Sequence, residues 1–386
     1  MADAFIVEAV RTAGGRRKGR LAGWHPADLG GEILNAIVER SGIAPDAIDD
    51  VIIGCVTQAG EQGFAFGRNV VLASKLPQTV PAVTIDRQCG SSQQAMQFAA
   101  QAVMSGTQDV VIAAGVESMT RVPMFSNITL HERDHIGTGP FSQRIQDRFG
   151  VPTFSQFTGA EMIAQKFGFS REALDSYALE SHRRAARATE DGAFAGEIIP
   201  IATEDGMHTV DEGIRFNATM EGLAGLDPLN EGGVISPGNA SQICDGASGT
   251  LIVSERALKS HGLTPIARIV DLTVTGGDPV IMLEEPIPAT RKALAKSGMK
   301  LEDIDLYEVN EAFASIPMAW MEALDADPAK LNVNGGAIAL GHPLGASGTK
   351  LMSTLIHALK ARGKKYGLQT MCEGGGIANV TIVEVL

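Results

Sequence analysis

The chain has 386 residues, of which 44% are hydrophobic and 20% are charged, so it can bury a sizeable core and is not a disordered chain. A net charge of −13 and an aromatic content of 5% argue against a nucleic-acid partner, because a phosphate backbone attracts basic residues and single strands stack on aromatic rings. No run approaches the ~20 apolar residues of a membrane span, and we expect neither a signal peptide nor a membrane partner.

The four cysteines, Cys55, Cys89, Cys244 and Cys372, form no C-x-x-C pair. They are too few for a disulfide framework, they do not predict a zinc site, and they fit a reducing compartment. We therefore expect a cytoplasmic protein.

In chain order, a strand is predicted at 4–7, and an internal repeat follows. The segment 42–51 resembles 298–307, and the two segments are 256 residues apart. At the same separation, Cys89-Gly90-Ser91-Ser92 stands opposite Gly345-Ala346-Ser347-Gly348. Two matches at one separation, in the same order of elements, predict a duplicated α/β unit.

Each copy of the repeat then predicts one helix followed by one apolar strand. Helices that alternate with strands are typical of βαβ units, so we expect mostly parallel sheets. The predicted helices span 93–104 and 349–361, and the predicted strands span 110–115 and 368–374.

The region 121–239 fits neither copy and is richer in polar residues and turn signals. Its one clear predicted helix spans 171–191, with Ser170 as the N-cap. We expect an inserted lid, which is a usual place for substrate contacts. The division that follows is an N-terminal half over 1–119 and about 245–262, an inserted loop domain over 120–244 and a C-terminal half over 265–386.

Cys89 lies at a predicted strand-to-helix turn made of small residues. The positive end of the helix dipole favours a thiolate, so this position predicts a reactive nucleophile with a lowered pKa. An inert buried thiol is the alternative.

His342 lies in a glycine-rich loop, 334–348, which the repeat places opposite the Cys89 loop. Because an imidazole can take the proton of a nearby thiol, the two residues would form a nucleophile and its base across a pseudo-twofold axis. A structural histidine in a tight turn is the alternative.

Two further positions stand at predicted strand ends. Cys372 precedes the glycines 374–376, whose backbone N–H groups would meet an anion; a flexible turn is the alternative. Asn310 interrupts an apolar run and is either a functional amide or the cap of the next helix.

The segment His131-Glu132-Arg133-Asp134-His135 matches the zinc pattern H-E-x-x-H, which works only on a helix. Glycines and a proline follow at 137–140 and leave room for one or two turns. The glycine-rich loops match neither the P-loop nor G-x-G-x-x-G. We therefore predict no metal and no nucleotide phosphate site from these patterns.

Taken together, the motifs resemble the thiolase family over essentially the whole chain. Four blocks match in order: the Cys89 loop, Asn310-Glu311-Ala312-Phe313, the segment 341–348, and Cys372 with its glycines. The resemblance implies a five-layered α-β-α-β-α fold with two pseudo-symmetric halves and an inserted loop domain. It also implies exchange between a 3-ketoacyl-CoA plus CoA and acetyl-CoA plus a shortened acyl-CoA, with coenzyme A as a substrate and no tightly bound cofactor.

The resemblance implies a role for each matching position. Cys89 would carry the acyl group, His342 would accept its proton, and Cys372 would be the second acid/base. Asn310 would hold a water that forms one oxyanion hole with His342, and the N–H groups of Cys89 and Gly374 would form the other.

Shorter matches imply the CoA contacts: Ser241 and Phe313 beside the pantetheine arm and Arg215 by the adenine. Glu373 replaces a residue that is commonly apolar in the family. The Cys89 loop, 87–94, looks more like that of thiolases that act on bulky or degradative substrates. Because relatives are dimers or dimers of dimers, we expect a homodimer or homotetramer.

Two alternatives stay open. A decarboxylating or non-decarboxylating condensing enzyme of the same fold would have a His where Cys372 stands. A non-catalytic CoA-binding homologue would lack one of Cys89, His342 or Cys372, and all three are present.

Overall fold

The computed structural model describes residues 2–386, and a single mixed β-sheet runs through it, in the order β11-β12-β13-β10-β1-β9-β5-β3-β4. Its two halves meet over a short register, where Phe5 is opposite Arg268 and Ile6 is opposite Ala267. The main strands are β1 (Ala4–Thr12), β3 (Asp50–Gly54), β4 (Ala82–Ile85), β5 (Val110–Ser118), β9 (Cys244–Ser254), β10 (Ala267–Gly276), β11 (Leu306–Val309), β12 (Tyr366–Glu373) and β13 (Ile377–Val385).

Helices lie on both outer faces and between the two half-sheets. They are α1 (Pro26–Ser41), α2 (Phe66–Ala73), α3 (Ser91–Ser105), α4 (Leu130–Arg133), α5 (Gln143–Phe149), α6 (Gln156–Phe167), α7 (Arg171–Glu190), α8 (Met220–Ala224), α9 (Glu255–His261), α10 (Pro286–Ser297), α11 (Ser315–Leu324), α12 (Ala337–Leu340) and α13 (Ser347–Ala361). The short strands are β2 (Gly15–Arg16), β6 (Ile198–Ile199), β7 (Ile201–Thr203) and β8 (Gly206–His208). Among the described residues, no helix is long and apolar enough to span a bilayer.

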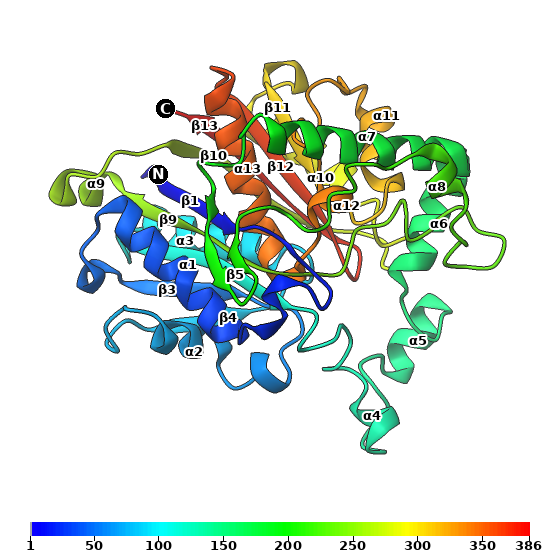
Figure 1. Cartoon of the computed structure of the whole chain (residues 1–386), viewed down its shortest axis with the longest axis horizontal. Helices are drawn as coiled ribbons and strands as arrows, with labels where there is room; N and C mark the ends of the chain where they lie inside the picture. The colour runs from blue at the N-terminus through cyan, green and yellow to red at the C-terminus, as the bar shows by residue number, and fades with distance from the viewer. Residues whose placement is uncertain (1) are drawn as a thin grey trace.

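The predicted five layers are present (Figure 1). α1 and α2 cover the outer face of the N-terminal half-sheet, α10 and α11 lie on the side of the C-terminal half-sheet, and α3 and α13 fill the space between the two. Three apolar clusters correspond to this arrangement, because one lies on each outer side and the third surrounds the two central helices. Burial of these faces supplies the main driving force for folding.

The duplication is confirmed by matching element bounds. α3 and α13, like β5 and β12, begin 256 residues apart. Gly42 and Gly298 end α1 and α10 in the same left-handed cap, with φ of 72° and 71°. The central helices begin two residues before the predicted 93 and 349.

The prediction of mostly parallel sheets is wrong. Parallel pairing joins β3 to β4 and β5, β11 to β12, and β1 to the short β6. Along the main path of the sheet, however, β1, β9, β10 and β13 pair with their neighbours antiparallel. The physical reason is the connection between strands: β12 and β13 are joined by a short glycine turn, which can only form a hairpin, whereas a parallel pair needs a long crossover.

The two central helices approach each other closely at their N-terminal ends. A Cβ on Gly348 of α13 would collide with the backbone of Gln93 of α3. Across the pseudo-twofold axis, the N–H of Thr349 donates to the Ser92 hydroxyl at 3.0 Å. Small residues at this crossing therefore bring the loop before α3 and the loop before α13 together.

The region between β5 and β9 contains α4 to α8. The predicted helix with Ser170 as N-cap is confirmed as α7, because the Ser170 hydroxyl accepts from the Ala173 N–H. Figure 1 shows α4 and α5 on an arm that extends away from the body. By contrast, α6 and α7 share their apolar core with the C-terminal half, where Ile163 and Leu174 belong to the same cluster as Trp320. The boundaries of the three units stay a prediction.

Candidate active site

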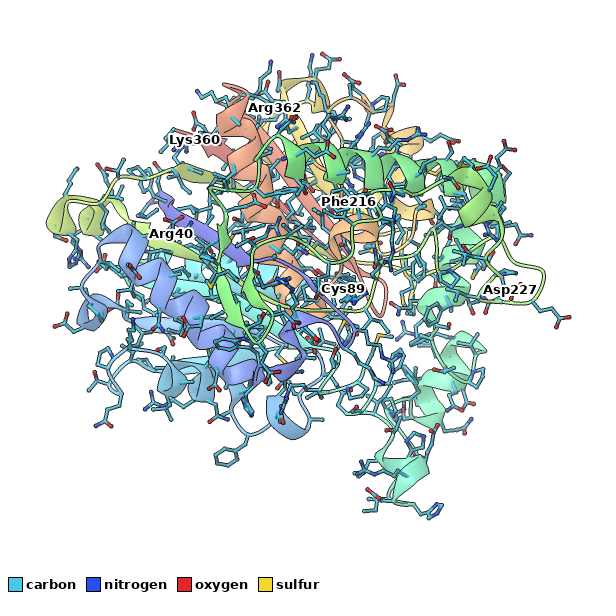
Figure 2. The ribbon with its side chains drawn as sticks, viewed as in Figure 1. Arg40, Cys89, Phe216, Asp227, Lys360 and Arg362 are labelled. Atoms are coloured by element: carbon cyan, nitrogen blue, oxygen red, sulfur yellow. The ribbon has the colours of Figure 1, made fainter. Side chains whose placement is uncertain are left out.

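Cys89 occupies the turn between β4 and α3, and Figure 2 places it at the centre of the molecule. The turn is held by Ser91, whose hydroxyl donates to the Gln88 carbonyl at 2.6 Å and accepts from the Arg87 N–H at 2.9 Å. Gln88 adopts a left-handed conformation, with φ of 47°. A locally bonded, strained turn of this kind fixes the direction of the next side chain, Cys89, which is 7% exposed.

His342 follows α12 and Gly341, and its ring is fixed by two hydrogen-bonding neighbours. The Ser347 hydroxyl donates its single proton to the Pro343 carbonyl at 2.9 Å, so it must accept at 2.5 Å from an Nδ1–H of His342. The other ring nitrogen, Nε2, is then unprotonated and faces the Asn310 amide at 3.5 Å. Burial, together with the charge of Lys350, lowers the pKa of His342 to about 3, so a neutral imidazole presents an acceptor.

Asn310 links His342 to Cys372. It follows β11, and its backbone N–H donates to the Thr370 carbonyl at 3.1 Å on the parallel neighbour β12. This pairing places its amide beside the end of β12, where it lies close to the Cys372 thiol and opposes part of the rise in its pKa. Burial raises the pKa of Cys372 to about 12. The Asn310 Oδ1 atom is buried and has no partner among the described residues.

The prediction of a lowered pKa for Cys89 is wrong. Burial raises the pKa of the Cys89 thiol well above its usual range, and the nearby Cys372 and Glu373 raise it further. The helix dipole is a local effect that the sequence displays, whereas removal of the thiol from water is a tertiary effect that outweighs it. A Cβ on Gly90, the residue after Cys89, would also collide with the carboxyl of Glu373, the residue after Cys372, so the two cysteines lie in the same region.

Gly374 lies against the Cys89 loop. A Cβ added to it would fall 2.9 Å from Oε1 of Gln88, so the turn after β12 touches the residue before Cys89. The structure thus brings Cys89, Cys372, Asn310 and Gly374 into one region, and Asn310 joins His342 to it.

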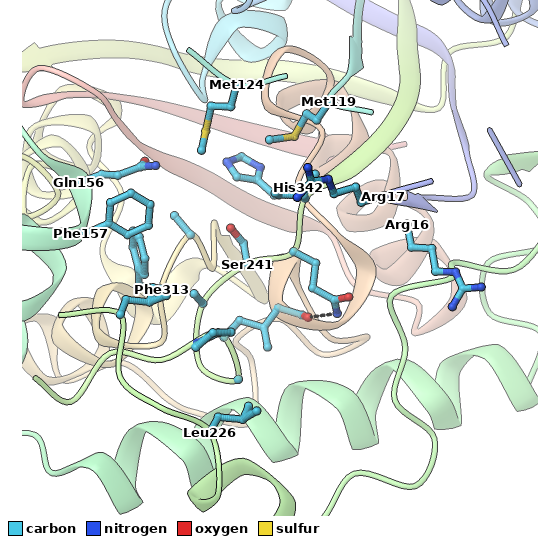
Figure 3. A pocket seen from close by; sticks show the side chains of 18 of the residues that line it. Arg16, Arg17, Met119, Met124, Gln156, Phe157, Leu226, Ser241, Phe313 and His342 are labelled. Carbon is cyan, nitrogen blue, oxygen red and sulfur yellow. Dashed lines mark hydrogen bonds between the residues drawn. The ribbon is translucent and has the colours of Figure 1, made fainter. Parts of the chain in front are cut away.

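A cavity of about 710 Å³ opens toward this region, and Figure 3 views it from close by. Its wall includes His342 and the three residues expected to contact CoA, namely Arg215, Ser241 and Phe313. The Phe313 ring packs edge to face on Phe157, with centroids 5.7 Å apart.

Cys89 lies behind one wall of the cavity. Met119, Met124 and Leu344 line the cavity and also pack in the small apolar cluster that contains Cys89. Methionine side chains are flexible and fill irregular space. These three side chains therefore form an apolar partition between the cavity and the Cys89 sulfur atom.

Sequence reasoning missed three cationic or titratable residues that line the cavity: Arg16, Arg17 and His182. In the view of Figure 3, Arg17 lies in the region of His342 and Met119, and Arg16 lies farther to the right. The consecutive arginines are visible in the sequence, but only the fold brings them to the residues expected to contact CoA.

Glu373 is buried although it carries a carboxyl group. Neither oxygen has a hydrogen-bond partner among the described residues, and a Cβ on Gly90 would collide with the carboxyl. Burial raises the pKa of Glu373 well above its usual range, although the charge of Arg87 opposes this. Glu373 is therefore a neutral acid packed against the Cys89 loop.

Comparisons with known proteins give one consistent result. The thiolase N-terminal domain matches residues 4–256, and the thiolase C-terminal domain matches 263–385. A steroid 3-ketoacyl-CoA thiolase of Mycobacterium tuberculosis is 52% identical over 100% of this chain and 95% of its own length. An acetyl-CoA acetyltransferase of Escherichia coli is 41% identical over 100% of both chains.

Solved structures agree with these relatives. The Bacillus anthracis acetyl-CoA acetyltransferase superimposes with a TM-score of 0.91 at 37% identity, covering 100% of this chain and 99% of that one. The human mitochondrial 3-ketoacyl-CoA thiolase does so with a TM-score of 0.89, also at 37% identity and with the same coverage.

The exposures and pKa shifts predict how the thiols react. Iodoacetamide should alkylate Cys89 before the other three cysteines, because Cys55, Cys244 and Cys372 are 0–2% exposed. Since thiolate is the reactive form, the rate in the free enzyme should rise about tenfold per pH unit from about pH 6 to about pH 9. Peptide mass mapping measures both. A rate that levels off near neutral pH, or faster labelling of Cys55, would contradict this picture.

Glu373→Gln should change how stability depends on pH. The native carboxyl keeps its proton, whereas in the unfolded chain it ionises above about pH 4.3. The wild type therefore loses stability as the pH rises from about 4.3 toward the higher pKa of the native carboxyl. Glutamine removes that loss. The melting temperature of the variant minus that of the wild type should become more positive from about pH 5 to about pH 8. The exposed Glu302→Gln is the control, and a constant or falling difference for Glu373→Gln would refute the buried neutral acid.

Proposed function

The chain belongs to the thiolase family, and we propose that it cleaves 3-ketoacyl-CoA with CoA, through an acyl group carried on Cys89. The observation that carries the proposal is the position of Asn310, whose amide lies beside the Cys372 thiol and faces Nε2 of His342 at 3.5 Å. Glu373, the residue after Cys372, packs against Gly90 of the Cys89 loop. Cleavage of a 3-ketoacyl thioester between C2 and C3 by a thiol uses a nucleophile, a base and an acid on one substrate.

In the first half of the reaction, the unprotonated Nε2 of His342 accepts the Cys89 proton while the sulfur attacks the 3-keto carbon. The bond between C2 and C3 breaks, and its electron pair stays on C2 of the departing thioester. The Cys372 thiol supplies a proton to that carbon, which gives acetyl-CoA and leaves the shortened acyl group on Cys89.

In the second half, the Cys372 thiolate takes the proton of an incoming CoA thiol. The CoA sulfur attacks the acyl group, and the Cys89 sulfur leaves and recovers its proton from His342. The negative oxygens formed at the two stages need donors aimed at them. We assign one set to His342 with a water held by Asn310, and the other to the backbone N–H groups of Cys89 and Gly374.

The cavity provides a channel for the CoA portion. We place the pantetheine arm between Phe313 and Ser241 and the adenine near Arg215, all of which line the cavity. Arg16 and Arg17 supply positive charge for the phosphates, which arginine binds through charged hydrogen bonds. A local basic lining offsets the overall charge of −13, which would otherwise repel an anionic substrate.

We further propose a degradative role on bulky acyl chains. The partition beside Cys89 is made of Met119, Met124 and Leu344, which can repack around substrates of different shape. The relative from Mycobacterium tuberculosis is by name a steroid 3-ketoacyl-CoA thiolase, which supports the same substrate class.

A homodimer or homotetramer is proposed from two exposed features. β4 is an edge strand that pairs only with β3 among the described residues, and its Val83 is 45% exposed; unpaired edges are templates for association. The arm with α4 and α5 presents the exposed apolar residues Leu130 and Ile136. Light scattering tests this, and a monomer at micromolar concentration would contradict it.

Because the reaction needs two reduced thiols, we also propose the cytoplasm as the compartment.

The decisive activity test is CoA-dependent cleavage of a series of 3-ketoacyl-CoA thioesters, from acetoacetyl-CoA to ring-bearing acyl chains. We expect cleavage of several members and the highest kcat/KM for the bulky ones. Absence of cleavage with every member would overturn the function. Fastest turnover of acetoacetyl-CoA would overturn only the bulky substrate class.

Asn310→Ala tests the assigned oxyanion site. Loss of one such donor typically lowers kcat by about 10²–10³-fold, while CoA binding measured by calorimetry should persist, because Asn310 does not line the cavity. Asn69→Ala, at a surface amide bonded to the Phe64 carbonyl, is the matched control. Turnover that is unchanged in Asn310→Ala would remove this residue from the mechanism.

A further inference from the structure

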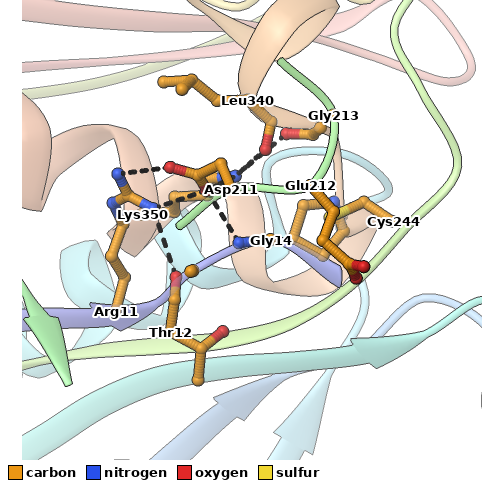
Figure 4. A network of polar contacts seen from close by, with 12 residues as sticks. Arg11, Thr12, Gly14, Asp211, Glu212, Gly213, Cys244, Leu340 and Lys350 are labelled. Atoms are coloured by element: carbon orange, nitrogen blue, oxygen red, sulfur yellow. Dashed lines mark hydrogen bonds and ion pairs between the residues drawn. The ribbon is translucent and has the colours of Figure 1, made fainter. Parts of the chain in front are cut away.

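Four charged side chains form a buried cluster that the proposed reaction does not use. Arg11 on β1, Glu197 before β6, Asp211 after β8 and Lys350 on α13 have side chains that are 0–4% exposed. Figure 4 shows Arg11, Asp211 and Lys350 of this cluster. The two positive and two negative charges balance. Burying charges is costly, and such clusters often stabilise a fold no better than apolar residues would. The contacts of this cluster with the surrounding backbone indicate what else it does.

Arg11 fixes the position of Asp211. The guanidinium donates to both Asp211 oxygens, at 2.8 and 3.1 Å, and to Glu197 at 2.5 Å. The Gly14 N–H donates to Asp211 Oδ1 at 2.7 Å. A carboxylate held by a bidentate arginine and a backbone donor has little freedom to move. It provides a rigid anchor 3.7 Å from the Lys350 ammonium.

Lys350 connects the cluster to the His342 loop through hydrogen bonds. Its ammonium donates to the Leu340 carbonyl at 2.5 Å and to the Gly341 carbonyl at 3.2 Å. These carbonyls belong to the C-terminal end of α12, where intrahelical donors are lacking and a cation is favourable. The next residue is His342, so both peptide units before the proposed base are tied to the anchor.

The loop cannot adopt another backbone path easily. Gly341 has φ of 79°, and a Cβ there would fall 2.7 Å from the Cys244 sulfur. The His342 N–H donates to the Gln242 carbonyl at 3.1 Å. Lys350 is thus one of several constraints on this turn, but it is the only one that brings a charge.

That charge acts on the imidazole as well. Lys350 disfavours a protonated His342 and adds to the effect of burial. The thiols on the elements packed around His342 are Cys89 before α3, Cys244 on β9 and Cys372 on β12, and the pKa of each is raised. The same elements carry the buried carboxyls Glu117 on β5, whose side chain accepts from the Gly345 N–H, Asp245 on β9 and Glu373 on β12. Burial raises the pKa of each carboxyl as well, which weakens the negative charge that they bring to this region.

We propose that Lys350, anchored by Asp211 and Arg11, is a positioning residue that holds the Gly341–His342 turn and so presents the imidazole for the reaction at Cys89. This inference rests on the proposed role of His342. Apolar residues could fill the same space in the fold. The inference gives the buried ion cluster a specific task, which is to position His342.

Lys350→Met removes the charge and the two donors while keeping the length of the side chain. We expect kcat to fall at least about tenfold with KM for CoA changed less than about twofold, because the loop that presents the base is affected and the CoA cavity is not. The acid limb of kcat/KM should move to higher pH, because His342 becomes easier to protonate. Lys350→Arg, which keeps the charge and offers donors, should restore most of the turnover and the wild-type pH profile.

Thr354→Val is the matched control on the same helix. The Thr354 hydroxyl donates to Glu197 at 2.9 Å, so this variant perturbs the cluster without touching the His342 turn, and its kcat and pH profile should stay as in the wild type. A fall in kcat of similar size in Thr354→Val would mean that general damage to the cluster, rather than the contacts of Lys350, is responsible.

Wild-type kcat and pH profile in Lys350→Met would overturn the inference. Should that variant fail to fold by circular dichroism, Lys350→Gln replaces it, and equal activity of the Gln and Arg variants would overturn the inference in the same way. Full turnover in His342→Ala would instead overturn the proposed role of His342 itself, so the two failures are distinguishable.

Discussion

The close crossing of α3 and α13 is the constraint on which the rest of the structure depends. Gly348 leaves no room for a side chain against the backbone of Gln93, and the Ser92 hydroxyl accepts from the Thr349 N–H. Because each helix follows its own loop, this crossing brings the Cys89 loop and the His342 loop to one place. The two half-sheets then add Asn310 and the end of β12 from the side.

Burial determines the electrostatics of the site. Removal from water keeps both thiols protonated, keeps His342 unprotonated and keeps Glu373 neutral. The resting site is therefore a set of neutral groups in fixed hydrogen-bonding positions, and proton transfer waits for a substrate. Formal charges surround these groups. Arg87 lies close enough to oppose the effect of burial on Glu373, and Arg16 and Arg17 line the cavity. The balanced cluster contacts the His342 loop through Lys350.

Much of this could be predicted from the sequence where the signal is local. The repeat at a constant separation gave the two halves, and glycines beside cysteine, histidine and asparagine marked the reacting positions. Tertiary effects could not be predicted. The direction in which the Cys89 pKa shifts depends on burial, and the antiparallel pairing depends on how the strands are connected. The Arg11–Asp211 pair joins residues 200 positions apart. Lys350 looked like an ordinary polar residue of a helix until the fold placed it beside two carbonyls.

The central claim is that Cys89, Cys372 and His342 act on one substrate, and acyl transfer to the enzyme in the absence of free CoA tests it most directly. Intact-mass and peptide mass spectrometry after incubation with acetyl-CoA should find one acetyl group, on the peptide that contains Cys89. The acetyl group should be absent in Cys89→Ala and should form much more slowly in His342→Ala. An unmodified wild-type enzyme, or an acetyl group on another residue, would contradict the account.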